Sequence, residues 1–569
     1  MQNLRRIIVG VAGLSLALPL LGSFQQSEER QKPVSLTPVA ILGQLRSGKM
    51  AGAHTDYVAA LDFSPDGRFI ATGSADGTVK LWSLKKKAPV RQFSDRATGP
   101  VQSIGFSGNG KLLAAGGQAG GVVVWKVESG KRLRKLSLPT ANKDAPPHIK
   151  SVALSQDGKT LLAAVLDHTV YRIAVKSGKK QALIAASPEH PSEYALGRGF
   201  AWSGEKPEIY DFDRFWFCPW EKTLALTPDG RLAVCRASSR SIAILDVQTG
   251  RIRAELEAGK GTDAALSDNE LGSAAGLALS PDGRRLAVVD TRGKARIWEL
   301  ATGKVLLTRK GWYFWTTAFA FSSDARLLAI ATDEDKIRII DCRSGEEVVE
   351  LEETGKTNLS LAFSPDGKLL AASGLEGVVR LWNVGGIRPK PAPVVSHLEI
   401  RKLNGYLDDL GGGDSRQAQI AIENLAANPE LSLPFIEEHL FPEDLDKAEV
   451  SRWMEALDDE NFEVRDQVDT KLRQSGGQAE EVLRERLKKK ASPETKARIR
   501  KILEALRPPF MTFPSEPLRR YREVEVLERI GRDEARTVLE RAEKESPSEL
   551  VREQARLALE RLDRASPEW

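Results

Sequence analysis

The chain has 569 residues, of which 41% are hydrophobic and 28% are charged. This balance is typical of globular domains and excludes both wholesale disorder and a membrane protein with many spanning segments. The 3 cysteines are too few for a scaffold stapled by disulfides. None of these figures indicates a class of enzyme.

The net charge of +5 is an average over two unlike parts of the chain. Residues Val394–Trp569 carry 30 Lys and Arg against 38 Asp and Glu, so the net charge is −8 there and +13 in the rest. A surplus spread this thinly does not indicate a nucleic-acid partner. Two short basic runs, Lys85–Lys87 and Lys488–Lys490, are interpreted as solvated loop or helix ends.

The amino terminus is typical of a secretory signal peptide. Arg5 and Arg6 precede an almost charge-free apolar run from Ile7 to Leu21. We therefore expect residues 1–23 to be a signal peptide and residues 24–37 to be a linker, in a protein exported to the periplasm or the cell envelope. The alternative is an uncleaved anchor, in which case this segment is the sole membrane contact.

Export would place Cys218, Cys235 and Cys342 in an oxidising compartment. One pair can form a disulfide there and leave a single thiol, or all three can remain buried thiols. The spacing of the cysteines does not choose between these alternatives.

A short pattern recurs seven times in the middle of the chain. It consists of an apolar residue, Ser or Thr, any residue, Asp or Asn, and then Gly or, once, Ala. Such sequences favour tight turns, and apolar runs flank each copy, so every copy predicts a β-hairpin. The copies are Phe63–Gly67, Phe106–Gly110, Leu154–Gly158, Leu226–Gly230, Leu279–Gly283, Phe321–Ala325 and Phe363–Gly367.

A third strand is predicted after each hairpin, and it ends at a large apolar residue, as in Asp76–Trp82 and Glu376–Trp382. A polar turn and a short fourth strand usually follow, as at Ser129–Leu133. Four strands in each of seven repeats predict a seven-bladed β-propeller over residues 38–386.

These repeats resemble the WD-repeat family over about Pro38–Gly386. The first repeat is the closest match, with His54, Ser74, Asp76 and Trp82 at the positions that the family joins by hydrogen bonds. The later repeats depart from the pattern, since most lack the Gly-His and Trp-Asp dipeptides. The resemblance implies a ring of blades that binds protein partners.

The family usually closes its ring by lending a strand from the amino end of the chain to the last blade. After the seventh repeat the chain runs into Gly385–Pro391, whose prolines prevent it from serving as a central strand. We therefore expect residues within Thr37–Arg46 to form the outer strand of the seventh blade.

Extra residues separate the fourth strand of some blades from the first strand of the next, and such connections all emerge on one face of a propeller. Many of these residues are aromatic, and aromatic side chains often anchor interfaces, so we predict a protein-binding patch over blades four to six. The predicted patch comprises Trp202, Tyr210, Phe215, Trp216, Trp220, Trp312, Tyr313 and Trp315. The alternative is that these rings form a satellite core between a long loop and the propeller.

After the seventh repeat the apolar residues recur at helical spacing. We predict a Pro/Gly-rich linker at 387–396 and an α-helical domain at 397–569, with Gly411–Gly413 ending one helix and Asp414 capping the next. The predicted helices are His397–Leu410, Ser415–Ala427, Leu433–Leu440, Lys447–Leu457, Phe462–Ser475, Ala479–Lys490, Pro493–Leu506, Leu518–Ile530, Asp533–Lys544 and Ser548–Leu562.

Two helical segments, Leu457–Leu472 and Ser546–Leu562, look like copies of one unit. Each has an acidic or Ser/Pro entry, then Val-Arg, then an apolar ladder at every fourth residue. This theme resembles HEAT-like repeats, and the helical domain is similar to extensions that follow WD-repeat propellers in some exported bacterial proteins. Stacked helix pairs of this kind provide an extended surface for protein partners.

The sequence contains no motif that indicates catalysis. It lacks H-E-x-x-H, G-x-x-x-x-G-K-[ST], G-x-S-x-G and C-x-x-C. The 6 histidines show no ligand spacing, and Asp211 with Asp213 is too small a set for a calcium site. We therefore expect no catalytic residue, no cofactor and no bound metal.

The combined interpretation is a non-enzymatic scaffold that holds two partner surfaces in a fixed relation, with protein partners and no nucleic-acid partner. The alternative is a propeller enzyme or a carbohydrate-binding protein that uses the central channel, which predicts converging His, Asp or Arg side chains at the channel mouth. A third option is a subunit of an envelope complex that is inert alone.

Overall fold

The computed structural model divides the chain into two units, Met1–Pro33 and Val34–Trp569. The predicted signal peptide and most of the linker after it lie outside the described residues. Among the described residues, no helix is both long and apolar enough to cross a membrane. The described residues are 34–43, 52–139, 148–166, 169–184, 224–236, 241–257, 274–290, 294–309, 316–332, 335–352, 354–355, 358–387, 400–441, 447–459, 461–474, 479–488, 492–506 and 515–565.

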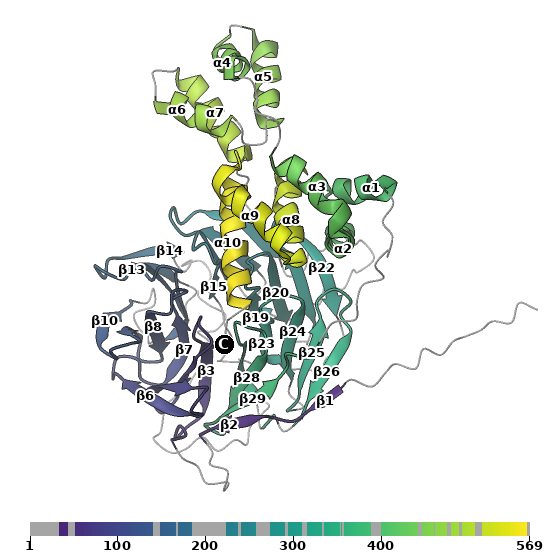
Figure 1. Ribbon diagram of the computed structural model, residues 1–569. Helices are drawn as coiled ribbons and strands as arrows, with labels where there is room; N and C mark the ends of the chain where they lie inside the picture. The colour runs from purple at the N-terminus through teal and green to yellow at the C-terminus, as the bar shows by residue number, and fades with distance from the viewer. Residues whose placement is uncertain are drawn as a thin grey trace, which may run out of the picture. The chain divides into compact units, whose positions relative to one another are not determined.

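Seven sheets follow one another along the chain and confirm the predicted seven-bladed propeller (Figure 1). Blades one to four comprise β3 (Val58–Phe63), β4 (Phe69–Ser74), β5 (Thr78–Ser83), β6 (Ala88–Ser94); β7 (Val101–Phe106), β8 (Leu112–Gly117), β9 (Gly121–Lys126), β10 (Arg132–Ser137); β11 (Ile149–Leu154), β12 (Thr160–Val165), β13 (Val170–Ala174), β14 (Lys180–Ile184); and β15 (Leu224–Leu226), β16 (Leu232–Arg236), β17 (Ser241–Asp246), β18 (Ile252–Glu257). Blades five to seven comprise β19 (Ala274–Leu279), β20 (Arg285–Asp290), β21 (Ala295–Glu299), β22 (Lys304–Arg309); β23 (Thr316–Phe321), β24 (Leu327–Thr332), β25 (Ile337–Asp341), β26 (Glu347–Leu351), β1 (Val34–Leu36); and β27 (Asn358–Phe363), β28 (Leu369–Gly374), β29 (Val379–Asn383), β2 (Ala40–Leu42).

The repeated Ser/Thr-x-Asp/Asn-Gly pattern builds the turn between the first and second strands of each blade. In blade one the Ser64 hydroxyl donates to Asp66 Oδ1 at 2.6 Å and accepts from the Phe69 amide at 2.9 Å. Gly67 completes this turn at a φ of 67°. The matching residue has positive φ in every blade, and in blade six Ala325 adopts it at 57° where the other blades have Gly.

Because neighbouring strands of a blade are antiparallel, the loops at the two ends of the strands define two faces. The turn face carries the loops between first and second and between third and fourth strands, as at Ser64–Arg68 and Leu84–Lys87 of blade one. The connection face carries the loops between second and third strands, as at Ala75–Gly77, and the connections from one blade to the next.

Apolar clusters between consecutive blades close the ring. Each cluster combines side chains of two neighbouring blades, and the last one packs Trp82 of β5 with Leu381 of β29. The residue predicted to end each third strand is buried in every blade: Trp82, Trp125, Ile173, Leu245, Trp298, Ile340 and Trp382. Each blade therefore buries apolar side chains against its two neighbours.

An amino-terminal strap, residues 34–42, crosses two blades. β2 pairs antiparallel with β29, with Ala40 opposite Leu381, so the prediction that Thr37–Arg46 supplies the outer strand of blade seven is confirmed. The sequence pattern does not predict β1, which pairs in parallel with β26 as a fifth strand of blade six, with Leu36 opposite Leu351. The strap thus ties blade six to blade seven.

Ten helices follow the propeller in the described part of the chain, in agreement with the predicted helical domain. They are α1 (Ile400–Gly411), α2 (Ser415–Ala427), α3 (Pro429–Leu440), α4 (Lys447–Ala456), α5 (Phe462–Gln474), α6 (Glu480–Lys488), α7 (Pro493–Leu506), α8 (Ser515–Ile530), α9 (Asp533–Glu545) and α10 (Glu549–Ala565). The prediction starts α3 too late, because Pro429 takes the first helical position, where proline is favoured.

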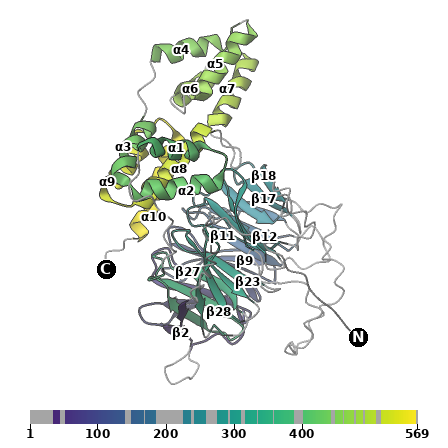
Figure 2. The same cartoon turned by 90° about the vertical axis from the view of Figure 1, so that its right-hand side faces the viewer.

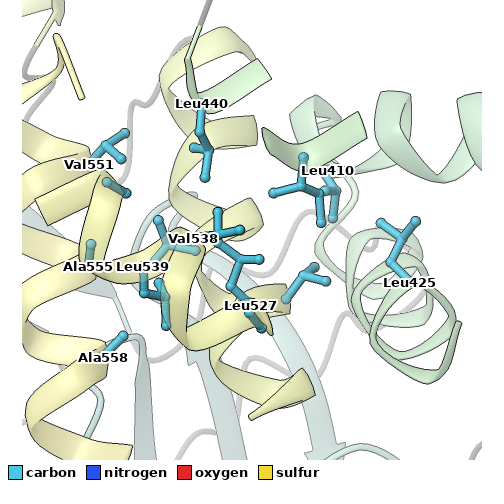
Figure 3. Close-up of a cluster of buried hydrophobic side chains, with 14 of the residues drawn as sticks. Leu410, Leu425, Leu440, Leu527, Val538, Leu539, Val551, Ala555 and Ala558 are labelled. Carbon is cyan, nitrogen blue, oxygen red and sulfur yellow. The ribbon is translucent and has the colours of Figure 1, made fainter. Parts of the chain in front are cut away.

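The helices form two groups with separate cores (Figures 1 and 2). Helices α1–α3 and α8–α10 share one core, which includes Leu410, Leu425 and Leu527 (Figure 3). Helices α4–α7 enclose a second core around Met454 and Leu483. The chain therefore leaves the first group after α3 and returns to it at α8, which packs against α1, α2 and α3.

Replacing Leu42 by Ala should destabilise the propeller by about 3 kcal/mol, because this fully buried side chain joins blade seven to blade one. Val39→Ala, in the same strap, is the control, since Val39 is 52% exposed and should change stability by less than about 0.5 kcal/mol. Urea denaturation followed by tryptophan fluorescence measures both. Equal midpoints for the two variants would show that the strap does not stabilise the ring.

Candidate functional site: a buried junction between propeller and helices

The eight aromatic residues predicted to bind a partner all lie outside the described residues: Trp202, Tyr210, Phe215, Trp216, Trp220, Trp312, Tyr313 and Trp315. The described strands that bracket them define where their segments leave the propeller. β14 and β22 end on the connection face, and β15 and β23 begin there. The prediction that these inserts share one face therefore agrees with the strand order, and the patch itself stays a prediction.

The predicted hydrogen-bonded group of blade one forms around a different hydroxyl. His54 Nδ1 lies 2.9 Å from Asp76 Oδ2, and His54 Nε2 lies 2.7 Å from Thr72 Oγ1. Trp82 Nε1 donates to the same Thr72 Oγ1 at 2.8 Å. Thr72 therefore takes the place that the sequence analysis assigns to Ser74, which lies two residues, or about 7 Å, farther along β4.

Ser74 instead forms hydrogen bonds with the two loops beside this group, which contain Asp56 and Asp76. Its hydroxyl donates to the Asp56 carbonyl at 3.1 Å and accepts from the Asp76 amide at 3.1 Å. Burial of the Asp76 carboxyl opposes its ionisation, but hydrogen bonds from His54 and Thr78 outweigh burial and lower its pKa. The group therefore stabilises blade one, and all its members serve the fold.

The helical region is joined to the propeller on the turn face, through Arg522 of α8. Its guanidinium is fully buried and pairs with Glu299 at the end of β21, with Nε donating to Oε1 at 2.9 Å and Nη2 to Oε2 at 2.7 Å. Nη1 donates to the carbonyls of Leu410 and Gly412 at 2.7 and 2.8 Å. One side chain thus binds a propeller carboxylate and the unpaired carbonyls at the end of α1.

The start of α2 meets the same carboxylate. The Ser415 hydroxyl donates to Glu299 Oε2, which also accepts from Thr302 Oγ1 at 2.8 Å. Gly411 ends α1 and Asp414 caps α2, as predicted, because Asp414 Oδ1 accepts from the Arg416 amide at 2.9 Å. The end of one helix and the start of the next are therefore both held against blade five.

Two arginines that follow the turn of blade five form the second half of the junction. Arg285 Nη2 donates to Glu525 Oε1 of α8 at 2.8 Å and to Gln419 Oε1 of α2 at 2.9 Å. Arg284 Nη1 donates to Glu528 Oε2 of α8 at 2.8 Å. The two arginine side chains are only 3% and 7% exposed, so these are buried ion pairs.

Two carboxylates of this junction, those of Glu525 and Glu528, favour their ionised form. Burial by itself would raise the pKa of Glu525 and Glu528, but the guanidinium groups beside them lower both pKa values. Arg285 is the main opposing charge for Glu525, and Arg284 is the main one for Glu528. These propeller arginines, together with Arg529 and Arg561 of the helices, therefore outweigh the desolvation of the two carboxylates.

Contacts on either side extend the junction over three blades. Arg231 of blade four lies 2.6 Å from Glu553 of α10, and Arg343 of blade six lies 3.5 Å from Glu423 of α2. Ala301 of blade five packs against Leu518 of α8. Figure 1 shows α8 and α10 over this side of the ring. Blades four to six thus contact the first helical group, α1–α3 and α8–α10.

A cavity of about 10 Å³ within the junction is lined by Arg284, Glu299, Gln419 and Glu525 among others. That volume holds about one water molecule, so this cavity has no room for a substrate or a cofactor. Among the described residues, no group of three His, Cys, Asp or Glu side chains is placed to hold a metal ion. The contacts of this junction join the helices to the propeller, and the sequence pattern does not predict them because the partners are far apart in the chain.

Two of the three cysteines are described. Cys235 and Cys342 are buried and free of disulfides, and Cys218 lies outside the described residues. Burial raises the pKa of the Cys235 thiol to about 12 and raises that of Cys342 as well. Both thiols therefore stay protonated and unreactive, as buried structural cysteines do.

Comparisons with known proteins agree with this architecture. The family model for the WD domain, G-beta repeat, matches residues 47–83 and 87–126, and the model for the anaphase-promoting complex subunit 4 WD40 domain matches residues 319–389. Together with the seven blades and the helices, these matches fit a WD-repeat propeller joined to a helical domain. Proteins of this class are typically non-catalytic scaffolds that bind other proteins.

One solved structure with similarity is the β-propeller domain of Cps50 (Swd1) from Myceliophteria thermophila. It shares 18% sequence identity with this chain at a TM-score of 0.47, and the match covers 58% of this chain and 97% of that one. No curated protein sequence is similar enough to count as a match.

Replacing Arg522 by Met should destabilise the junction by about 3 to 5 kcal/mol, because it leaves Glu299 buried without its cation. Arg532→Met is the control, since Arg532 and its partner Glu430 are 59% and 85% exposed and their pair contributes less than about 1 kcal/mol. Chemical denaturation of the full chain measures both. Similar losses in the two variants would contradict a stabilising role for the buried pair.

Acid should weaken the junction through Glu525 and Glu528. Their pKa values are lowered in the folded protein, so their stabilisation is present above the unfolded pKa of about 4.3 and is lost as the pH falls through the folded values. Denaturation midpoints measured between about pH 7 and pH 3 should fall less steeply for Glu525→Gln than for the unchanged protein. Glu430→Gln is the exposed control, and parallel slopes for all three proteins would refute the assignment.

Proposed function

We propose that this protein is a non-enzymatic scaffold, exported from the cytoplasm, that holds two protein-binding surfaces in a fixed relation. The observation that carries the proposal is the buried junction, in which Arg522 pairs with Glu299 and Arg285 pairs with Glu525. A tilt of the helices on the propeller would part these charges while they are still buried, which is strongly unfavourable. The two parts therefore move as one body.

The first proposed surface is the connection face over blades four to six. The described helices contact these blades on the turn face, which lies opposite the connection face. The predicted aromatic residues belong to segments that leave the propeller on this connection face. We propose that rings such as Trp216 and Trp315 anchor a protein partner there.

The second proposed surface lies on the helical region, as HEAT-like helix pairs. The two segments predicted to be copies occupy α5 and α10, each of which packs against the preceding helix. Arg465 Nη1 donates to the Asp459 carbonyl at 2.5 Å, and Arg552 Nη1 donates to the Ser546 carbonyl, so each arginine binds the carbonyl six residues before it. This shared geometry supports one repeated unit.

Export is proposed from the amino-terminal sequence, in which Arg5 and Arg6 precede the apolar run from Ile7 to Leu21. The burial of Cys235 and Cys342 is compatible with that location, because buried thiols withstand an oxidising compartment.

The double variant Trp216→Ala with Trp315→Ala should lose its protein partner and keep its thermal unfolding midpoint, because interface aromatics contribute binding energy without supporting the ring. Quantitative affinity capture from an envelope fraction measures binding, and calorimetry measures folding. Ile252→Ala is the matched control, since Ile252 is 54% exposed on the outer strand β18 of blade four. A lower midpoint for the Trp variant would instead support a satellite core.

A further inference from the structure

A basic residue follows the turn of every blade and lies on the turn face. Because the seven positions are equivalent in the repeat, they have the same relation to the strands of their blades. They are Arg68, Lys111, Lys159, Arg231, Arg284, Arg326 and Lys368.

Two of these positions bind acidic side chains of the protein's own helices. Arg231 of blade four lies 2.6 Å from Glu553 of α10. Arg284 of blade five lies 2.8 Å from Glu528 of α8. On the turn face, α8 and α10 therefore dock on the propeller through acidic side chains that pair with the basic residues after the turns.

The equivalent positions of blades one to three are exposed. The side chain of Arg68 is 67% exposed and that of Lys159 is 82% exposed, and Lys111 is exposed as well. Arg68 and Lys159 contact acidic residues of their own turns, at 2.7 and 3.1 Å. Exposed pairs of this kind are weak and exchange readily for a better partner.

The same face of these blades has a clear excess of positive charge. The turns at 64–68, 84–87, 107–111, 127–131, 155–159 and 175–179 carry nine Lys and Arg against three Asp and Glu. Two of the three carboxylates, Asp66 and Asp157, already accept hydrogen bonds from Ser64 and Ser155 within their turns. Lys85–Lys87 and Lys131 add exposed cations beside the three equivalent positions.

We infer that the turn face of blades one to three is a docking surface for an acidic helical segment of another protein. Two observations support it: the surface continues an interface that the chain already makes with its own helices, and its charge is complementary to acidic side chains such as Glu528 and Glu553. The inference goes beyond the proposed function, because it concerns the face opposite the aromatic inserts and names the chemistry of the partner.

The test measures binding of a fluorescent helical peptide of Glu and Ala to the full chain by anisotropy. The triple variant Arg68→Glu, Lys111→Glu, Lys159→Glu should bind about tenfold more weakly than the unchanged protein, because three exposed charge pairs are lost and replaced by repulsion. The control reverses three exposed cations elsewhere, as Lys402→Glu, Arg500→Glu, Lys501→Glu, and should change affinity by less than about twofold.

Several results would overturn the inference. Absence of peptide binding by the unchanged protein, or an equal loss in both triple variants, would show that the surface has no specific role. Tighter binding to single-stranded DNA or to phosphatidylglycerol vesicles, lost in the first triple variant, would assign it to a nucleic acid or a membrane. A dimer lost in that variant would assign it to a second copy of the chain. If charge reversal impairs folding, the same positions are changed to Gln, and an unchanged affinity there also counts against the inference.

Discussion

The architecture depends on closure of the ring. A single four-stranded blade cannot bury both of its apolar faces, so each blade is stable only between two neighbours. The cluster that packs Trp82 of blade one with Leu381 of blade seven completes the series. The strap also stabilises the ring, because it pairs with β26 of blade six and β29 of blade seven. Only in a closed ring do the turns of distant repeats form one continuous face.

The junction joins the helices to the turn face mainly through buried charged side chains. Its contacts are mainly buried charges with directional hydrogen bonds, and the apolar cluster around Ala301 is small. Buried ion pairs add little net stability compared with apolar packing, but a misplaced partner is heavily penalised. Arg522 has correctly placed partners on both sides, because it binds a carboxylate of blade five and the last carbonyls of α1 at the same time. The junction therefore selects one orientation of the helices on the propeller.

A fixed orientation gives the molecule distinct surfaces with different chemistry. In the proposed function, the segments with the predicted aromatic patch leave the propeller at the connection face and the helical groups carry the proposed second surface, while the turn face of blades one to three is basic. A scaffold of this form can bring separate partners to a constant distance from one another. Such a role needs no reactive group, and the buried thiols of Cys235 and Cys342 are consistent with a structural use of cysteine.

The sequence alone determined the features that rest on contacts between near neighbours. Ser64, Asp66 and Gly67 form their turn within a few residues, so seven copies of that pattern were enough to predict seven hairpins. Asp414 caps a helix through amides two and three residues away, and α2 has the predicted bounds. Apolar periodicity depends equally on neighbouring residues, and it located all ten described helices.

Only the tertiary structure decided the features that rest on distant partners. Thr72, and not the predicted Ser74, contacts both His54 and Trp82, and these partners lie 18 and 10 positions from it in the chain. The pairing of β1 with β26 and the contact of Arg522 with Glu299 each join residues more than two hundred positions apart. Lys159 and Arg284 occupy the same place in the repeat, yet one is exposed and the other buried. A repeat pattern records the local fold of each blade, and the environment of each blade is set by what the rest of the chain packs against it.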